Sequence, residues 1–328
     1  MLQQTVPTAP PPPDLGPVVE AEYHQLLRGP QHRWWRPLLS ILLVGLIFIG
    51  FSLVLGVVAL AVGALLGRPS TWFEDVLNRG ANDPVYMLFI DASLIILIPT
   101  ALFPIRAAHK VPMGFVSSVI GRFRWRWFAT CLVALTPLWL VYVGIDWFAA
   151  GYTTDTPAQY WEWLVLMALV LTPLQCAGEE YMFRGWFMQS LGSWFANRWV
   201  ALGVPLVLSV ALFALAHGSL DIWILIQLAT FATAATYLTW RTGGLEAAVA
   251  LHTVNNVLVM ILGAVTGTGD DSMIDASTTS SWFPAVIGLV VHTLAVLIVV
   301  WLARRNAITR THPMHLKTPR VGDGQRRP

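Results

Sequence analysis

Residues 38–66 read LLSILLVGLIFIGFSLVLGVVALAVGALL, and this stretch contains no charged side chain. It is longer than the roughly 20 residues that an α-helix needs to cross about 30 Å of hydrocarbon. A water-soluble protein rarely carries so long an apolar helix, because the outer face of that helix would contact water. The stretch therefore predicts a membrane-spanning helix, with lipid as the solvent for the neighbouring chain.

Seven further apolar stretches follow, and the composition fits a protein embedded in lipid. Hydrophobic residues make up 56% of the 328 residues, and charged residues make up only 12%. Backbone amides cannot remain without hydrogen bonds in hydrocarbon, so spans of this length must be helical. The sequence predicts an all-α fold, a polytopic membrane helical bundle of about eight transmembrane helices. The expected spans are residues 38–66, 85–105, 127–147, 161–182, 199–217, 222–240, 244–265 and 283–302.

The two ends of the chain differ in composition from the membrane domain. Residues 1–35 begin with a proline-rich segment that lacks apolar periodicity, which predicts a disordered arm. Residues 36–303 form the predicted eight-helix domain, and its motif-bearing core is 161–265. Residues 304–328 are basic and contain several prolines, so we expect a flexible cytoplasmic tail near anionic headgroups.

Arginine and lysine are unevenly distributed among the connections between the predicted helices. They cluster before the first helix, between the second and third, and after the fourth, sixth and eighth, whereas the opposite connections are mostly acidic or neutral. The positive-inside rule therefore predicts a multi-pass cell-membrane protein with both termini in the cytoplasm. The residues that carry this inference are Arg28, Arg33, Arg36, Arg106, Lys110, Arg122, Arg124, Arg126, Arg198, Arg241, Arg304 and Arg305.

Charged and sulfur-containing residues exclude some classes of function. A formal net charge of +2, spread over short loops, does not form the basic patch of a nucleic-acid-binding protein. Cys131 and Cys176 lie within apolar stretches, where we expect them to pack as small hydrophobic side chains without forming a disulfide. Apart from Lys110 and Lys317 the basic residues are arginines, a bias that favours a bacterial source with a GC-rich genome.

A short polar cluster interrupts the fourth apolar stretch. Glu179, Glu180 and Arg184 stand in otherwise apolar sequence, although an ionised side chain at mid-bilayer costs roughly 2.5 to 3.5 kcal/mol on insertion scales. Glu180 and Arg184 are one helical turn apart, so they can form an ion pair that offsets much of this cost. Glu179 is rotated about 100° from Glu180 and has no cation on its own helix. The pattern predicts a structural role for Glu180 and a chemical role for Glu179.

Two later helices each carry a pair of residues four positions apart. Phe213 and His217 lie on one face of the fifth predicted helix, and His252 and Asn256 lie on one face of the seventh. A carboxylate in a low-dielectric site becomes a stronger base toward water, and a histidine can orient that water or relay its proton. Donors from another helix can stabilise the oxyanion of a tetrahedral intermediate. Together with Glu179, these residues suit the hydrolysis of a peptide bond.

The three groups of residues, taken in order, resemble the three-motif signature of the CPBP membrane proteases. This family comprises the type II CAAX prenyl endopeptidases and bacterial relatives implicated in bacteriocin processing or immunity. The resemblance covers about residues 161–265, half of the predicted membrane domain. The motifs that carry it are Glu179-Glu180-x-x-x-Arg184, Phe213-x-x-x-His217 and His252-x-x-x-Asn256.

The resemblance implies two groups of site residues and a class of substrate. In the catalytic group, Glu179 and His217 activate a water molecule. His252 and Asn256, in the same group, stabilise the oxyanion. The implied substrate is a peptide or protein embedded in the lipid bilayer or attached to it by a lipid anchor. The residues implied to shape the site are Glu180, Arg184 and Phe213.

Three alternatives stay open beside this interpretation. Glu179, His217 and His252 could bind Zn²⁺ with a water as the fourth ligand, but the motifs lack the His-x-x-x-His spacing of zincins, so we expect no metal cofactor. A noncatalytic scaffold or an immunity-type protein could use the same fold to bind a partner helix. A transporter could pass protons through the same residues, although no inverted repeat supports one. The motifs leave open the substrate, its cleavage site, the oligomeric state and the membrane face on which the site opens.

One distance limits how these residues can meet. His217 lies about 27 Å along its helix from the cytoplasmic end at 1.5 Å per residue, whereas Glu179 lies nearer to the cytoplasmic end of its own apolar stretch. The two can share a site if the fourth helix continues past Arg184 toward Phe195, because Glu179 would then lie near mid-membrane. This arrangement also requires a fifth helix that is tilted or that starts deeper in the membrane.

Overall fold

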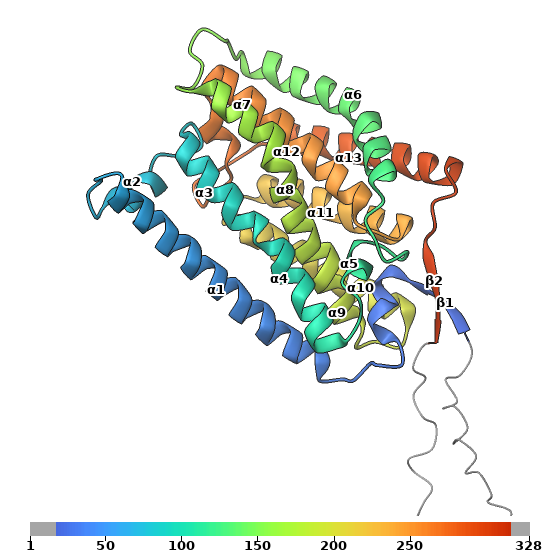
Figure 1. The fold of residues 1–328 in the computed structure, drawn as a ribbon. Coiled ribbons are helices and arrows are strands. Elements are labelled where there is room, and N and C mark those ends of the chain that lie inside the picture. Colours follow the sequence, from blue (N-terminus) through green and yellow to red (C-terminus); the bar gives the residue numbers. More distant parts are fainter. Residues whose placement is uncertain (1–17, 316–328) are drawn as a thin grey trace, which may run out of the picture.

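The computed structural model describes residues 18–315, apart from the side chain of Ser272. Within this range, seven helices are long and apolar enough to cross a membrane, and a pair of helices with a 41° bend adds an eighth candidate span. This confirms the predicted polytopic helical bundle (Figure 1). Six spans are single helices, namely α1 (Arg36–Leu65), α6 (Trp125–Ala150), α10 (Arg198–Ala216), α11 (Ile222–Thr242), α12 (Glu246–Thr266) and α13 (Trp282–Arg305).

The second and fourth spans are each built from several helical segments. Pro173 lies in the first turn of α8 and cannot donate a backbone hydrogen bond to the preceding turn, which explains the bend at this point. The second span consists of α3 (Pro84–Ile95), α4 (Leu97–Pro104) and the π-helix η2 (Ile105–His109). The fourth consists of α7 (Trp161–Val170), α8 (Thr172–Glu180), the π-helix η3 (Tyr181–Phe187) and α9 (Met188–Gly192).

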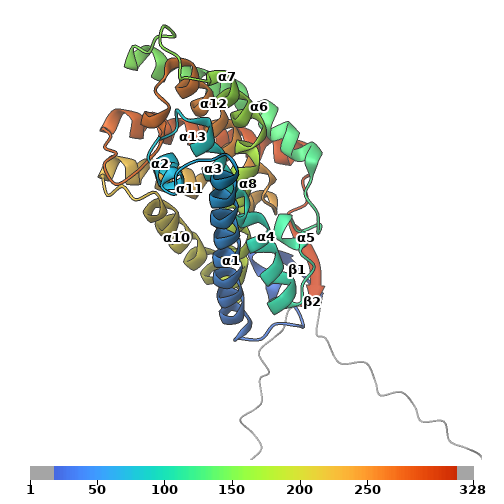
Figure 2. The ribbon, with the colours of Figure 1, turned by 60° about the vertical axis from the view of Figure 1, so that its left-hand side comes forward.

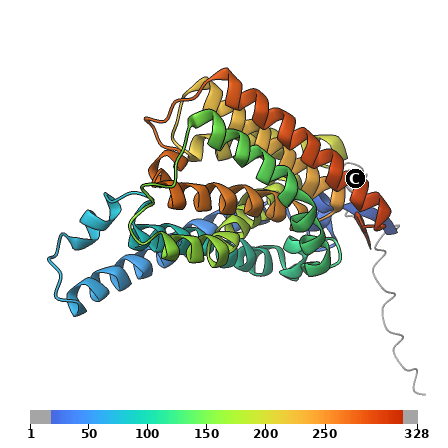
Figure 3. The same cartoon turned by 90° about the horizontal axis from the view of Figure 1, so that it is seen from above.

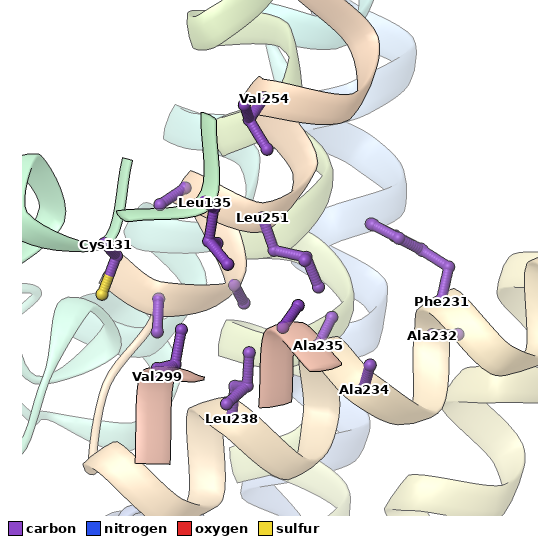
Figure 4. Close-up of a cluster of buried hydrophobic side chains, with 14 of the residues drawn as sticks. Cys131, Leu135, Phe231, Ala232, Ala234, Ala235, Leu238, Leu251, Val254 and Val299 are labelled. Atoms are coloured by element: carbon purple, nitrogen blue, oxygen red, sulfur yellow. The ribbon is translucent and has the colours of Figure 1, made fainter. Parts of the chain in front are cut away.

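The main apolar core lies between α6, α11, α12 and α13. Small side chains such as Ala232 let these helices approach closely, and Leu135 and Leu251 fill the remaining space (Figure 4). Close packing of this kind is what holds helices together in lipid, where the hydrophobic effect is weak. Cys131 belongs to this core and Cys176 is buried elsewhere, and both are free thiols as expected. α12 also packs against α7 and α8, which places it at the centre of the bundle (Figure 1).

α1 is the span that leaves most of its surface exposed. It packs against α4 and η2 near its start and against the short helix α2 (Trp72–Leu77) at its end, while most of its apolar side chains remain uncovered. Figures 1 and 3 show it at the edge of the bundle, diverging from the other helices toward α2. An apolar helix surface of this kind suits contact with lipid chains.

The two ends of the described chain pair with each other. β1 (Val18–Glu22) and β2 (Thr311–His315) form an antiparallel two-stranded sheet, in which Val18 pairs with His315. The 3-10 helix η1 (Tyr23–Arg28) follows β1. We call β1, η1 and β2 the terminal cap, which lies at one end of the bundle near α5 (Gly114–Ser117) (Figures 1 and 2), with η1 packed against α9 and α10.

The terminal cap corrects the predicted N-terminal boundary. A disordered arm at residues 1–35 is wrong for residues 18–28, which form β1 and η1. Tyr23 and Leu27 are buried there, and the Tyr23 hydroxyl donates a hydrogen bond to the carbonyl of Val116. These contacts join segments far apart in the sequence, so no local pattern in the arm predicts them.

The same feature corrects the C-terminal tail. A flexible tail at residues 304–328 is wrong for residues 311–315, which form β2, and α13 continues to Arg305. β2 pairs with β1, which comes from the other end of the described chain. The sequence of the tail alone therefore does not predict the strand. The predictions for residues 1–17 and 316–328 lie outside the described residues.

Candidate active site

The polar cluster of the fourth span lies at the junction of α8 and η3. Glu179 and Glu180 end α8, Arg184 lies in η3, and all three are buried. The helical path continues past Arg184 to Gly192 at the end of α9, so Glu179 lies about 20 Å from that end at 1.5 Å per residue. The fourth helix thus continues past Arg184, although it ends at Gly192 and does not reach Phe195.

Glu180 is held by two partners from two helices. Its Oε1 atom accepts hydrogen bonds from Arg184 Nη1 at 3.0 Å and from His252 Nδ1 at 2.9 Å. The side chains of Glu180 and Arg184 are completely buried, and the Arg184 guanidinium lies 4.4 Å from the centroid of the Phe213 ring, a cation–π contact. The predicted ion pair is confirmed, and the negative charge of Glu180 is compensated.

Parts of this ion pair have no hydrogen-bond partner. Within residues 18–315, Glu180 Oε2 and the Nε and Nη2 atoms of Arg184 are buried without a hydrogen bond. Leaving a buried donor or acceptor unsatisfied costs about 1–3 kcal/mol. A catalytic role or a bound water is among the reasons why natural proteins retain such atoms.

His252 connects the two carboxylates. A carboxylate only accepts hydrogen bonds, so His252 Nδ1 carries the proton in its contact with Glu180. His252 Nε2 lies 4.0 Å from Glu179 Oε2, which is farther than a direct hydrogen bond. Glu180 thus fixes the orientation of the imidazole, and the second nitrogen faces Glu179.

A chain of hydrogen-bonded side chains from three helices orients Glu179. Gln175 Nε2 donates to Glu179 Oε1, and Asn256 Nδ2 donates to Gln175 Oε1 over 3.4 Å. Asn255 Nδ2 donates to Asn256 Oδ1 over 3.0 Å. Trp139 Nε1 of α6 donates to Asn255 Oδ1, also over 3.0 Å. The chain fixes the Oε1 atom of Glu179 and leaves Oε2 for other contacts.

His217 approaches this cluster through Phe213. It is the C-cap residue of α10, and its Nδ1 donates to the Phe213 carbonyl over 2.8 Å, so Nε2 of the neutral imidazole keeps a lone pair. The Phe213 ring lies 4.8 Å from the His217 ring and 6.2 Å from the His252 ring, centroid to centroid. No hydrogen bond joins His217 to Glu179 in the described part of the chain. The structure therefore places His217 beside Phe213, whose ring lies between His217 and His252.

Three residues at the site were not assigned a role from the sequence. Gln175 stands one helical turn before Glu179, a spacing that could have identified it as a partner. Trp139 and Phe231 come from other helices, and the Phe231 ring lies 4.8 Å from the His252 ring. No local pattern connects these two aromatic residues with the motifs.

The alternative zinc ligands are not gathered into a metal site. Among the residues that the structure describes, no group of three or more His, Cys, Asp or Glu side chains is arranged to hold a metal ion. Glu179 and His252 face each other, but His217 lies against Phe213. This donor set does not fit a zinc ion, so no step proposed below passes through one.

The fold and the site define a multi-pass membrane protein with a buried cluster of glutamate and histidine. Residues 161–258 match the model of a family described as type II CAAX prenyl endopeptidase Rce1-like. This segment contains all three motifs, so the resemblance drawn from them is confirmed. A curated relative, the uncharacterized protein YyaK of Bacillus subtilis (strain 168), is 26% identical over 239 residues, which cover 69% of this chain and 76% of that protein. No solved structure matches the chain.

Proposed function

We propose that the protein is an intramembrane endopeptidase in which Glu179 activates the hydrolytic water. At the level of the family, the matched segment supports a protease of the CAAX type. The observation that carries the more specific proposal is the contrast between the two adjacent carboxylates. The negative charge of Glu180 is compensated by Arg184 and His252. By contrast, the Oε2 atom of Glu179 lies 4.0 Å from His252 Nε2, which is farther than a direct hydrogen bond. A water molecule near Oε2 would lie within reach of both a base and an imidazole.

In the proposed reaction, Glu179 Oε2 takes a proton from the water as the water oxygen attacks the carbonyl carbon of the peptide bond. The tetrahedral oxyanion then accepts hydrogen bonds from Asn256 and from Nε2 of His252. For His252 this requires that Nε2 also carries a proton, because Nδ1 donates to Glu180. For Asn256 this means that the amide N–H leaves Gln175, a contact that is already long at 3.4 Å. The proton on Glu179 passes to the leaving nitrogen, and the C–N bond breaks. His217, whose Nε2 can accept a proton, orients the water from the side of Phe213.

The position of the site restricts the substrate. The residues of the site belong to spans four, five and seven of the bundle, and Glu179 is only 9% exposed. A soluble protein would have to enter the bilayer to reach it, at a large cost for its polar surface. We therefore propose a substrate that is already in the membrane, either a transmembrane segment or a lipid-anchored peptide.

The orientation in the membrane is also a proposal. The pairing of β1 with β2 supports an arrangement with both ends of the chain on one side of the bundle. The distribution of arginine then favours the cytoplasm for that side. Reporter fusions after Arg241 should report the cytoplasm and a fusion near Asp271 the exterior, and the reverse pattern would overturn this orientation.

The function is tested by comparing the peptides released from membranes of cells that carry the wild type or Glu179→Ala. Peptides made by the protease should disappear with Glu179→Ala. Glu162→Ala is the matched control, because it removes an exposed carboxylate from the first turn of α7 in the same span. Identical peptide profiles for the wild type and Glu179→Ala would overturn the proposal and favour a noncatalytic scaffold.

A further inference from the structure

A cavity lies between α3, α7, α8 and α12, on the side of Glu179 that faces away from the terminal cap. Asp91, Thr172 and Met260 line it, and Ala81 and Gly269 line its outer end. It offers about 20 Å³ to the centres of water-sized molecules. One buried water needs roughly 10–15 Å³ by this measure, so the cavity is large enough for a water.

Asp91 presents an unpartnered carboxylate oxygen to this cavity. The residue is 1% exposed, and its Oδ2 atom is buried without a hydrogen bond in the part of the chain that the structure describes. Thr172 lines the same cavity, and its hydroxyl donates to Met260 Sδ over 3.4 Å. A thioether is a weak acceptor. A water that bridges Asp91 and Thr172 would supply the partner that the buried carboxyl group needs.

Thr172 also begins a polar row on α8 that ends at Glu179. Gln175 and Glu179 follow it at three and seven positions, which lie on one face of an α-helix. Gln175 Nε2 donates to Glu179 Oε1. The row therefore joins the cavity to the proposed base through side chains that can form hydrogen bonds.

The outer end of the cavity borders a loop at the surface of the bundle. Asn82 Oδ1 accepts from the Gly269 amide over 3.1 Å, and Asn82 Nδ2 donates to the Gly267 carbonyl over 3.3 Å and to Asp270 Oδ2 over 2.9 Å. Asp270 is exposed. This hydrogen-bonded loop thus lies at the outer end of the cavity, whereas apolar residues such as Leu164 form its other walls.

We propose that Asp91 and Thr172 hold a water molecule in this cavity, and that this water replenishes the water consumed at Glu179. A hydrolase enclosed by membrane helices uses one water for each bond that it cuts, and buried polar side chains provide the path for its replacement. Water would then enter from the end of the bundle opposite the terminal cap. The supply role rests on the proposed proteolytic function, whereas the water site itself does not.

Radiolytic footprinting of the full-length protein in lipid nanodiscs tests the water site, because hydroxyl radicals formed from a bound water oxidise the side chains beside it. Met87 lines the cavity and is 5% exposed, and the completely buried Met188 of another core cluster is the internal reference. Met87 should be oxidised more than Met188 in the wild type and in Asp91→Asn, which retains hydrogen bonding. In the double variant Asp91→Leu with Thr172→Val, Met87 should be oxidised no more than Met188. Equal oxidation of Met87 and Met188 in the wild type would overturn the water site.

Turnover of a membrane peptide by the wild type, by the double variant and by Thr172→Val alone tests the supply. Thr172→Val keeps the shape of the side chain, and kcat should fall roughly 2- to 10-fold, the equivalent of one neutral hydrogen bond, with KM unchanged. Thr130→Val is the control, because its hydroxyl bonds only to its own helix in α6. If the double variant loses the excess oxidation of Met87 but its kcat is unchanged, the supply role is overturned. If Glu179→Gln cleaves as fast as the wild type, the proteolytic function fails while the oxidation of Met87 still decides the water site.

Discussion

Glu179 and Glu180 are neighbours in the chain, yet their carboxylates face different groups. The Glu180 carboxylate contacts the guanidinium of Arg184 and the imidazole of His252, and it is not exposed to solvent. Its charge therefore holds these two side chains in place. Glu179 has one oxygen fixed by Gln175 and one that remains available. At the scale of single residues, this division separates a structural acid from a chemical one.

Glu180→Gln should destabilise the protein. The substitution leaves Arg184 without its counter-charge in a low-dielectric region, and breaking a buried ion pair typically costs about 3–5 kcal/mol. Thermal unfolding in nanodiscs should show a lower Tm. The double variant Glu180→Gln with Arg184→Met should recover part of the loss, because no charge is then left unpaired. An unchanged Tm for Glu180→Gln would contradict the structural role.

Gln175→Leu should slow turnover more than it affects folding. It removes the donor to Glu179 Oε1 and the acceptor of the Asn256 amide. A hydrogen bond to a charged group is worth about 1.5–3 kcal/mol, which corresponds to a fall in kcat of roughly 10- to 100-fold. Gln227→Leu in α11 is the matched control, since Gln227 bonds to Ser280 away from the site. Equal rates for the two variants would show that Gln175 does not orient the base.

The residues of the site differ in how far the sequence could identify them. The pair of Glu180 and Arg184 follows from a local rule, since residues four apart on a helix are neighbours. The contact between Glu180 and His252 joins positions 72 residues apart, so the motif order suggested it but only the fold places it. No sequence pattern identified Trp139 as a site residue, because its hydrogen bond to Asn255 depends on how α6 packs against α12.

At the scale of elements, the fourth span is the segment that carries the site, and its shape is not that of a plain helix. Pro173 produces a bend before the acidic pair, and the π-helix η3 follows it. Such π segments are rare and frequently occur at functional sites. Hydropathy predicted the existence of the span because lipid thickness sets its length. Hydropathy could not predict the bend, which depends on which backbone hydrogen bonds are lost.

Gly178→Ala should disturb the contact between α3 and α8. A Cβ atom at Gly178 would overlap with the carbonyl oxygen of Leu94, and this backbone atom cannot move without displacing α3. Overpacking of a core typically costs about 1–3 kcal/mol, so we expect a lower Tm and slower cleavage. Gly203→Ala in α10 is the control, because no other atom lies within 4 Å of the added Cβ. Equal Tm values for the two variants would contradict the close approach of α3 and α8.

At the scale of the whole molecule, the terminal cap ties the first span to the last. His24 of η1 donates from Nε2 to the Arg198 carbonyl over 3.1 Å, and Arg28 donates to the Ser193 carbonyl over 2.9 Å. The cap thereby connects both chain ends to α9 and α10. Composition predicted unstructured ends here, because proline and charge outweigh the few apolar residues such as Leu26 that anchor the cap.

Docking of the cap should weaken in acid. Burial lowers the pKa of His24 to about 4, although the nearby Glu22 opposes this shift. The undocked imidazole has a pKa of about 6.5, so it binds a proton more readily than the docked one. The cap is therefore fully stabilised above pH 6.5 and loses up to about 3 kcal/mol as the pH falls toward 4.

Hydrogen exchange measures this effect directly. After correction for the intrinsic effect of pH, amides of residues 18–28 and 311–315 should exchange faster at pH 5 than at pH 7. His24→Gln should remove the difference, because a glutamine amide can donate to the Arg198 carbonyl without titrating. Equal protection of the wild type at both pH values would argue against a buried neutral His24.

The central claim is that Glu179 is the base and Glu180 is structural, and one paired measurement on Glu179→Gln in proteoliposomes tests it most directly. Glutamine retains the size and the hydrogen bonds of the side chain but cannot take a proton from water. The Tm should therefore stay at the wild-type value while cleavage of a membrane peptide falls by at least about 10²-fold, the low end for a general base. Cleavage near the wild-type rate, or a Tm as low as that of Glu180→Gln, would contradict the account.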